Sequence, residues 1–549
     1  MSVKKMTASV LAFIMTAASS GGVWAENAAT STAAATNVRI KQELKDDAGR
    51  RDREAVLATK EAAGKTSVLD EAEFAKYDNK PLVDLKTVAF NDSSIFSKEE
   101  LQAICRPFVG TKVSLRDLYK MTALINIAYR DRGAVAAMAV LPEQDVTTGA
   151  VKIELVEGRV GELSVSGVKH TKPAFVTKRL RSQSGDLVDS RQFERDLTRI
   201  NALYDIPSKV ALAPGKTFGT TDVDVQVQEP QNLTAMVFTD NAGKDDIGLY
   251  RYGVVTSDRS VFGIRDAFTL GTVGSQGMQN AFLSYGLPLN RWGTRFLSSF
   301  DYSRTNVIAG DLADLDVIGT YYGGSGRLTQ PVYVSQTAVS SLYSEYALKH
   351  STSAFGGNTT FDTKITDYTL GCESMVYGEK SVTNYDAHVI SGKDRNASNT
   401  YRTYNLSADQ VRSTWGTQRL TMKARLQLAS SDLIPSSEQY QLGGSATIRG
   451  YTEGLLVGDN GYLTGLEYDI ALGKALRPFV FVDHGQIMKY RGDVIRNSNM
   501  HSLTSAGFGT QIAFAKYFSG KVTYAMPLID HPYEEHSGPK ALFYFQLVF

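Results

Sequence analysis

Histidine and cysteine side chains serve many enzymes as bases and nucleophiles, so their spacing is a first test for catalysis. The seven histidines of this chain are scattered, and its two cysteines are Cys105 and Cys372. No H-E-x-x-H, G-x-S-x-G or G-x-x-x-x-G-K-[ST] run accompanies them, which argues against a zinc protease, a serine hydrolase and a nucleotide-binding loop. His484 follows Asp483, but neighbouring residues of a strand point to opposite faces. The sequence therefore predicts no enzyme, no metal site and no cofactor.

Two short runs near the C-terminus combine an arginine, a carboxylate and glycines. The first consists of Ile448, Arg449, Gly450 and Tyr451, and the second contains Phe481, Asp483 and Gly485. An arginine can bond a carboxylate through two parallel hydrogen bonds, and Gly450 and Gly485 would let backbones approach closely. The first run lies in a connection of roughly 30 residues, far above the usual length, so we expect this connection to have a function. The alternative is an ordinary exposed turn.

The residues around these runs have the pattern of long β-strands. At 420–428 every even position is apolar, whereas Lys423 and Arg425 stand between them, and Glu467 and Asp469 hold similar places in the next strand. A soluble β-sandwich also alternates, but mid-strand charges opposite an unbroken apolar face favour a water-filled lumen. The strands also reach the roughly 9–11 residues that a tilted membrane strand needs. The pattern predicts a transmembrane β-barrel.

We assign the barrel to residues 230–549. The high content of aromatic residues and glycine in the whole chain suits strands that face lipid on one side and water on the other. The last strand, Ala541–Phe549, places apolar side chains on one face, and Phe549 is a candidate membrane-targeting residue. The net charge of +1 gives no electrostatic reason to expect nucleic acid as a partner.

The N-terminus predicts export. Lys4 and Lys5 precede an apolar segment too short for a membrane helix, and Ala25 completes a small-residue cleavage site. We therefore expect residues 1–25 to be a cleaved signal peptide. Residues 26–80 contain a charge-rich stretch with helical propensity, which on charge alone suits a solvated linker. A disulfide would be permitted outside the cytoplasm, but the two cysteines fall in different predicted domains.

Between linker and barrel, two regions show the same order of predicted elements. Residues 81–158 read as strand, helix, helix, strand and strand, with a capping box at Ser97 and Glu100 opening the first helix. Residues 159–229 repeat this order, with helices predicted at Pro173–Arg181 and Ser190–Leu203. Each region should be a small α+β domain with a free sheet edge.

This order of parts resembles the TpsB transporters of two-partner secretion, the haemolysin-activator and filamentous-haemagglutinin transporter family of the outer-membrane assembly-factor superfamily. The first α+β region carries residues similar to the family's Y-x-x-x-G and L-P-x-Q-D…G…V-E-G runs. They are Tyr129, Gly133, Leu141, Pro142, Gln144, Asp145, Gly149, Glu157 and Gly158. The runs around Arg449 and Asp483 are similar to the tip of the family's sixth extracellular loop and to a motif of a following barrel strand.

The resemblance implies a barrel of sixteen antiparallel strands preceded by two periplasmic α+β POTRA domains. It implies that the sixth loop folds into the lumen, that Arg449 pairs with Asp483, and that a helix at 38–57 plugs the resting pore. It also implies a monomer that is inserted by the barrel assembly machinery, contacts outer-membrane lipid and binds a secreted exoprotein such as an adhesin, cytolysin or toxin. The exoprotein would cross unfolded, without nucleotide hydrolysis.

Two other functions fit parts of the pattern. A relative that inserts barrels into the outer membrane shares the superfamily, but such assembly factors commonly carry more POTRA repeats than the two predicted here. A passive porin would not require periplasmic α+β domains. The L-P-x-Q-D run favours secretion over an assembly factor.

Overall fold

The computed structural model describes residues 77–430, 434–488, 501–514, 517–532, 534 and 538–549, together with Ala33, Thr36 and Ile40. The predicted signal peptide, and the predicted helix at 38–57 apart from Ile40, lie outside these residues. The chain divides into two compact units, one comprising Ala63–Pro230 and the other comprising Gln231–Phe549 with the N-terminal residues through Ala62. No helix among the described residues is long and apolar enough to cross a membrane.

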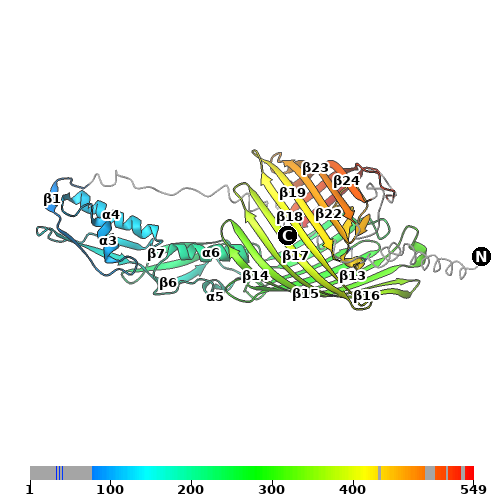
Figure 1. The fold of residues 1–549 in the computed structure, drawn as a ribbon, viewed down its shortest axis with the longest axis horizontal. Helices are drawn as coiled ribbons and strands as arrows, with labels where there is room; N and C mark the ends of the chain where they lie inside the picture. Colours follow the sequence, from blue (N-terminus) through cyan, green and yellow to red (C-terminus); the bar gives the residue numbers. More distant parts are fainter. Residues whose placement is uncertain are drawn as a thin grey trace, which may run out of the picture. The chain divides into compact units, whose positions relative to one another are not determined.

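The first α+β region is a three-stranded sheet with two helices (Figure 1). Its elements are β2 (Thr87–Phe90), α3 (Lys98–Cys105), α4 (Leu115–Asp131), β4 (Ala137–Val140) and β5 (Ala150–Glu157). β5 is the central strand and pairs in parallel with β2 and antiparallel with β4. A short strand pair, β1 (Pro81–Asp84) and β3 (Lys112–Ser114), precedes α4. Both helices begin at capping boxes, at the predicted Ser97 and at Ser114.

The second α+β region repeats this order. Its elements are β6 (Arg159–Ser166), α5 (Pro173–Thr177), α6 (Ser190–Tyr204), β7 (Ser208–Pro214) and β8 (Thr220–Val227), with β8 parallel to β6 and antiparallel to β7. The helix predicted at Pro173–Arg181 is shorter, because after Thr177 the amides of Arg179 and Leu180 bond to carbonyls three residues earlier. The Arg179 guanidinium lies 3.4 Å from the centre of the Phe175 ring and holds this tight turn in place.

Each second helix carries an asparagine that occupies one edge of its sheet. Asn126 on α4 accepts a hydrogen bond from the Ala139 amide of β4 at 2.6 Å and donates one to its carbonyl at 3.4 Å. Asn201 on α6 accepts from the Ser208 amide of β7 at 2.9 Å and donates to its carbonyl at 3.3 Å. The outer edges of β4 and β7 are thus partly satisfied by side chains, which makes them poorer templates for a further strand.

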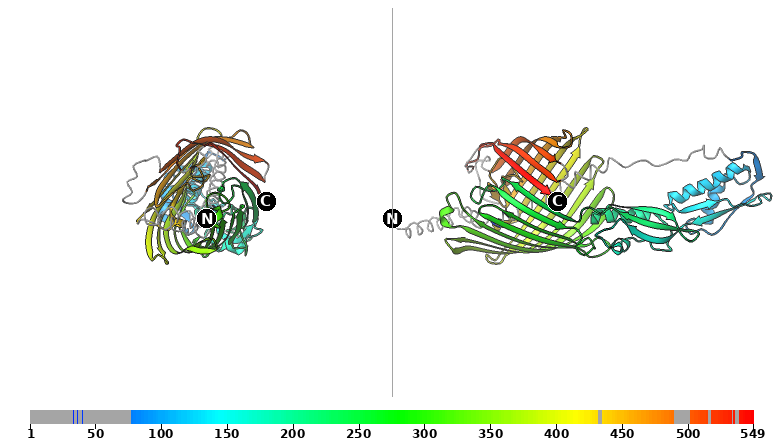
Figure 2. Two further views of the ribbon diagram at one scale, coloured as in Figure 1. Left: turned by 90° about the vertical axis from the view of Figure 1, so that its right-hand side faces the viewer. Right: turned by 180° about the vertical axis from the view of Figure 1, so that it is seen from behind.

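The barrel closes with sixteen antiparallel strands, which confirms the predicted fold class (Figure 1). They are β9 (Leu233–Asp240), β10 (Arg251–Asp258), β11 (Ala267–Gly274), β12 (Met278–Pro288), β13 (Arg295–Asn306), β14 (Ile318–Val334), β15 (Ala338–Phe355), β16 (Asn358–Tyr377), β17 (Ser381–Asp394), β18 (Asn399–Ser413), β19 (Gln418–Ala429), β22 (Asn460–Ile470), β23 (Leu476–Met488), β24 (Ser502–Phe514), β25 (Phe518–Pro527) and β26 (Lys540–Val548). The last strand pairs with the first, so the red β26 lies beside the green β9 (Figure 2). Phe549 prolongs this ladder through two backbone hydrogen bonds to Ala235.

The two faces of the barrel wall differ as the alternation predicted. On β23, Phe479, Phe481 and Asp483 are 3%, 3% and 0% exposed, whereas the intervening Val480 and Val482 are 56% and 48% exposed. The first set faces the lumen and the second faces outward, because neighbouring side chains of a strand point to opposite faces. Lipid would cover the outward apolar residues.

Loop six, defined here as residues 430–459 between β19 and β22, has secondary structure of its own. It contains the 3-10 turn η3 (Ser436–Glu438) and a small hairpin of β20 (Tyr440–Leu442) and β21 (Leu456–Gly458). The Ile448–Tyr451 run lies at the tip of this hairpin. A connection of this length with internal strand pairing is a structured element and not a simple turn.

Candidate functional site

The structure brings Arg449 of loop six against Asp483 of β23. Arg449 Nε donates to Asp483 Oδ2 at 2.7 Å, and Nη2 donates to Oδ1 at 3.0 Å. The backbone amide of Arg449 is a third donor, 3.3 Å from Oδ2. The arginine is 8% exposed and the aspartate 0%, so this two-pronged pair is shielded from solvent.

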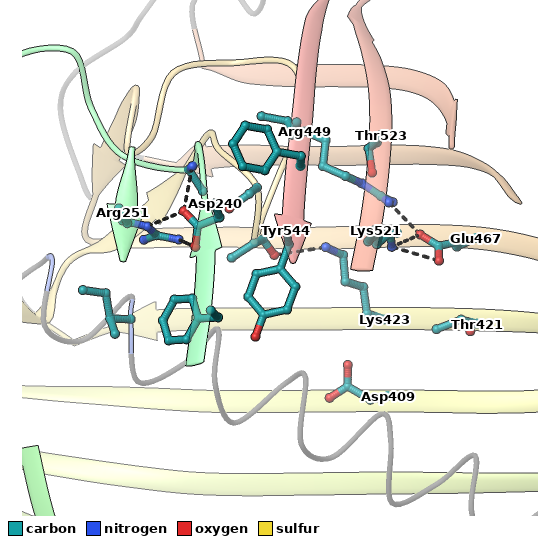
Figure 3. A pocket seen from close by; sticks show the side chains of 18 of the residues that line it. Asp240, Arg251, Asp409, Thr421, Lys423, Arg449, Glu467, Lys521, Thr523 and Tyr544 are labelled. Atoms are coloured by element: carbon teal, nitrogen blue, oxygen red, sulfur yellow. Dashed lines mark hydrogen bonds and ion pairs between the residues drawn. The ribbon is translucent and has the colours of Figure 1, made fainter. Parts of the chain in front are cut away.

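Further lumenal residues extend this pair into a network. Arg449 Nη1 donates to Glu467 Oε2 of β22 at 2.6 Å, and Lys521 Nζ of β25 lies 2.9 Å from the same oxygen (Figure 3). The Arg449 guanidinium stacks 3.5 Å from the centre of the Phe481 ring. The tip of loop six is therefore bonded to β22 and β23 and, through Glu467, to β25. Arg449 and Lys521 thus provide cationic partners for both carboxylates, as buried charges require.

The residues that flank Arg449 fix the tip by packing. Ile448 and Tyr451 are 0% and 3% exposed and pack with Leu442, Leu463 and other buried residues of the same hydrophobic cluster. The Tyr451 hydroxyl lies 2.8 Å from the carbonyl oxygen of Thr504 on β24 and 2.8 Å from that of Ile529, in the connection between β25 and β26. Loop six thus has a charged attachment and an apolar one side by side.

Glycine is required at the tip and favoured where the wall meets the loop. Gly450 has a φ of +94°, in the left-handed region that strains other residues. A Cβ at Gly485 would lie 2.8 Å from the Tyr462 carbonyl oxygen and 3.0 Å from the Leu442 side chain. Gly465 pairs with Asp483 in register, and a Cβ there would lie 2.9 Å from Asp483 Oδ1. Gly465 is a third glycine of this site, in addition to the predicted Gly450 and Gly485, and it was not predicted from the sequence.

A second charged attachment, near the start of loop six, was also missed from the sequence. Glu438 of η3 lies 2.7 Å from Lys349 Nζ of β15, and the same nitrogen lies 2.8 Å from Asp367 Oδ2 of β16. Tyr401 of β18 donates to the other Asp367 oxygen at 2.6 Å. Loop six is therefore bonded to β15 at its start and to β22 and β23 at its tip, which lie in different parts of the wall.

The N-terminal residues that the structure describes lie in the barrel unit. Ile40 is 2% exposed and packs with Phe238, Val273 and other buried residues of one lumenal cluster. It lines the same cavity as Arg449, and this cavity is shown in Figure 3. Ala33 is 1% exposed and packs against Tyr321 of β14. Ala33 and Ile40 therefore lie against the inner wall of the barrel.

Residues of the first α+β region that the sequence singled out lie within its fold. The Tyr129 hydroxyl of α4 donates to Glu157 Oε1 of β5 at 3.1 Å, so the Y-x-x-x-G and V-E-G runs meet. Glu157 also accepts from the Ser94 amide at 2.9 Å and from the hydroxyls of Ser93 and Ser94. Burial raises the pKa of Glu157, but these hydrogen bonds outweigh it and hold the pKa below its usual value.

The remaining residues of the two runs shape turns around β5. Gln144 bonds both the amide and the carbonyl of Lys152 at 2.7 Å and so prolongs the ladder beyond β4. Asp145 accepts from the Thr147 amide at 2.9 Å, and Gly149 closes this turn with a φ of +83°. The others lie at the same turns and strand ends: Gly133 follows α4, Leu141 packs on the core, the Pro142 carbonyl accepts from Gln144, and Gly158 joins β5 to β6. These contacts support a structural role.

Replacing Glu157 by glutamine is expected to destabilise the first α+β region by about 2 kcal/mol, because it weakens hydrogen bonds to a charged acceptor. The lowered pKa of Glu157 also means that its contribution is present above the unfolded-state pKa of about 4.3 and is lost as the pH falls through the folded-state value. Hydrogen exchange of the Ser94 amide in the full-length protein, followed from neutral to acidic pH, measures both effects. The exposed Glu154 on the same strand provides the matched control, Glu154→Gln. Equal protection in both variants would contradict the role of Glu157.

The fold and the site define a closed sixteen-stranded transmembrane barrel whose sixth extracellular loop is bonded inside the lumen. Residues 219–512 match the family described as haemolysin secretion/activation protein ShlB/FhaC/HecB, and residues 83–158 match the ShlB-type POTRA domain. The first match covers more than half of the chain. The protein therefore belongs to this family of outer-membrane transporters of two-partner secretion.

Individual relatives agree with this assignment. The chain is 23% identical to the heme/hemopexin transporter protein HuxB of Haemophilus influenzae, over 82% of this chain and 84% of that one. It is 21% identical to the outer membrane transporter CdiB of Dickeya dadantii, over 82% and 83%. Among solved structures, CdiB from Escherichia coli matches with a TM-score of 0.69 at 17% identity, covering 94% of this chain and 98% of that one. At this identity the likeness supports the fold.

Proposed function

We propose that this protein binds an unfolded exoprotein in the periplasm and secretes it through the barrel lumen without nucleotide hydrolysis. The observation that carries the proposal is loop six, which is bonded inside the lumen in a chain that belongs to a family of two-partner secretion transporters. A secretion pore must be narrowed at rest and cleared during transport, and an attached loop allows both. Folding of the exoprotein outside the cell would make its return unfavourable. The exoprotein would be a large adhesin, cytolysin or toxin.

The N-terminal helix completes the proposed resting state as a plug. Ala33, Thr36 and Ile40 are 1%, 3% and 2% exposed. Ala33 and Ile40 pack against residues of the inner wall, which supports a segment inside the lumen and argues against a solvated linker. The plug would have to leave before the exoprotein enters.

The exoprotein would first add a strand to a POTRA sheet edge, since main-chain hydrogen bonds tolerate many sequences. In the first domain the edge of β4 is partly occupied by Asn126. Among the described residues, by contrast, none bonds to the outer edge of Val88–Phe90 in β2. The free edge of β2 is therefore the better template, and Ala89 lies in its middle.

A photo-cross-linking amino acid at Ala89 is expected to trap the exoprotein during secretion. The same amino acid at Met138 of β4, which is 52% exposed, is the matched control and should trap much less. Cells that express both proteins are irradiated, and adducts are identified by mass spectrometry. Equal trapping at both sites would contradict selective binding to β2, and no adduct at either would contradict recognition by this sheet.

The remaining assignments complete the proposal. Residues 1–25 would be the cleaved signal peptide, 26–80 the plug and linker, 81–158 and 159–229 two periplasmic POTRA domains, and 230–549 the barrel. The barrel assembly machinery would insert the barrel with the aid of Phe549. The transporter would then work as a monomer.

A further inference from the structure

Exposed basic side chains gather on the outer surface of the barrel, away from the lumenal site. The outer basic patch consists of Lys364 on β16, Lys393 and Arg395 at the end of β17, and Arg402 on β18. On β16, Lys364 shares its face with Tyr368 and Leu370, which are 60% and 68% exposed and point outward. Strand register places the other members of the patch on the same outward face, because Thr366 lies opposite Lys393 and Ser391 lies opposite Arg402.

The patch concentrates positive charge that the protein itself neutralises only in part, at Lys364. Lys364 lies directly opposite Arg395, whose amide donates to the Lys364 carbonyl at 2.7 Å. Like charges in directly opposite positions of two strands destabilise a sheet. Asp362 lies 3.5 Å from Lys364 but is shared with His350 at 2.8 Å. Within the described part of the chain, no carboxylate lies within ion-pair distance of Lys393, Arg395 or Arg402.

A row of tyrosines places the patch at a membrane interface. Tyr322, Tyr346, Tyr368 and Tyr404 are 46%, 40%, 60% and 45% exposed on the outer surface of β14, β15, β16 and β18. Aromatic girdles of this kind mark the edges of the apolar band of a membrane barrel. Along β16 and β18, Lys364 and Arg402 lie on the far side of Tyr368 and Tyr404 from Leu370 and Leu406. They are therefore at the height of lipid head groups.

Chain direction shows which leaflet this is. β9 directly follows the POTRA-bearing region, so it starts at the periplasmic end of the barrel, and the strands then alternate in direction. β17 consequently ends, and β16 and β18 begin, at the extracellular end. The patch faces the outer leaflet.

The outer wall has two hollows at the patch, and Arg395 lines both of them. One is lined by Lys364 and His350 among others, and the second by Lys393 and Arg402 among others. Arg395 Nε donates to Thr366 Oγ1 at 2.8 Å, which fixes its guanidinium between the two hollows. Arginine and lysine side chains fixed beside an apolar surface are suited to the phosphate of a lipid.

We propose that the outer basic patch binds the phosphate groups of a phosphorylated glycolipid of the outer leaflet. Lys364, Lys393, Arg395 and Arg402 contact the phosphates, and the acyl chains lie against the leucines below the tyrosine row. The bound lipid offsets the repulsion between Lys364 and Arg395 and stabilises the extracellular ends of β15 to β18. The inference does not depend on what the barrel secretes.

The test uses the full-length protein in non-ionic detergent, titrated with purified lipopolysaccharide and followed by native mass spectrometry. The triple variant Lys364→Gln, Lys393→Gln, Arg395→Gln is expected to bind about 100-fold more weakly, since each basic residue near an anionic lipid surface contributes about fivefold. The matched control, Lys380→Gln, Arg412→Gln, Lys474→Gln, removes three exposed charges at the other end of the barrel and should bind like the wild type. Heat-modifiable migration of each variant on a gel checks that the barrel is folded.

Two further titrations identify the group that is bound. Lipopolysaccharide from which the phosphates have been removed should bind as weakly as the triple variant does. Equal binding of the dephosphorylated lipid, or wild-type affinity in the triple variant, would overturn the proposal. Binding of inorganic phosphate alone, with no gain from a lipid, would overturn the assignment to a glycolipid.

Discussion

Replacing Arg449 by alanine is expected to lower exoprotein secretion by about tenfold or more while the barrel still inserts in the outer membrane. The arginine compensates Asp483 and Glu467, which are 0% and 8% exposed, so its removal takes away the ion-pair partner of Asp483 and one of the cationic partners of Glu467. Breaking a buried ion pair in this way costs about 3–5 kcal/mol. A tenfold change in the ratio of attached to detached loop tips needs only about 1.4 kcal/mol, so the tip would be detached most of the time.

One variant separates the geometry of this pair from its charge, and a second variant is the control. Arg449→Lys keeps the charge but cannot make two parallel bonds to Asp483, so its secretion should lie between wild type and alanine. Arg327→Ala breaks a lumenal ion pair of 2.6 Å with Glu373 that does not involve loop six, and its secretion should stay near wild type. The measurements are exoprotein in the medium and barrel in the outer-membrane fraction. Normal secretion by Arg449→Ala beside normal insertion would show that the tip attachment is not needed.

Replacing Lys349 by methionine is expected to raise the ion conductance of the resting pore several-fold. Lys349 lies between Glu438 of loop six and Asp367 of the wall. Its loss therefore leaves two carboxylates close to each other, with little of either side chain exposed to solvent. Their repulsion, on the order of 3–5 kcal/mol by analogy with other broken buried pairs, would push η3 away from β15 and β16. The tip attachment at Arg449 would remain, so secretion should fall much less than in Arg449→Ala.

Single-channel recording in planar bilayers measures this effect. Glu345→Gln changes a charge on the same strand and the same lumenal face, four residues away and without a contact to loop six among the described residues, and serves as the control. An unchanged conductance in Lys349→Met would mean that the start of loop six does not narrow the pore. An equal rise in Glu345→Gln would point to lumenal charge in general.

Most of the fold could be predicted from the sequence because the alternation of side chains and the order of elements are local signals. The mid-strand charges at Lys423, Glu467 and Asp469 indicated a wet lumen without any knowledge of strand pairing. The capping box at Ser97 likewise depends on four consecutive residues, and the structure contains it. The helix predicted from Pro173 was too long because a tight turn after Thr177, held by Arg179 on Phe175, has no distinct local pattern.

Only those site residues that stand in a sequence motif could be assigned a contact from the sequence. Arg449 and Asp483 stand in two short runs, but Glu467 was recognised merely as a lumenal charge, since its contact with Arg449 depends on the register of β22 against its neighbours. Lys349 is 89 residues from Glu438 in sequence and lies in no motif, so only the closed barrel brings the two together. Contacts of this kind depend on how loop six folds back, which side-chain periodicity does not encode.

The measurement that tests two-partner secretion most directly is comparative mass spectrometry of culture medium and outer membrane, with and without this protein. The account predicts the loss of one large exported protein from the medium while other outer-membrane barrels keep their abundance. A broad loss of those barrels would contradict it and indicate an assembly factor, and no change in either fraction would contradict it in favour of a passive pore.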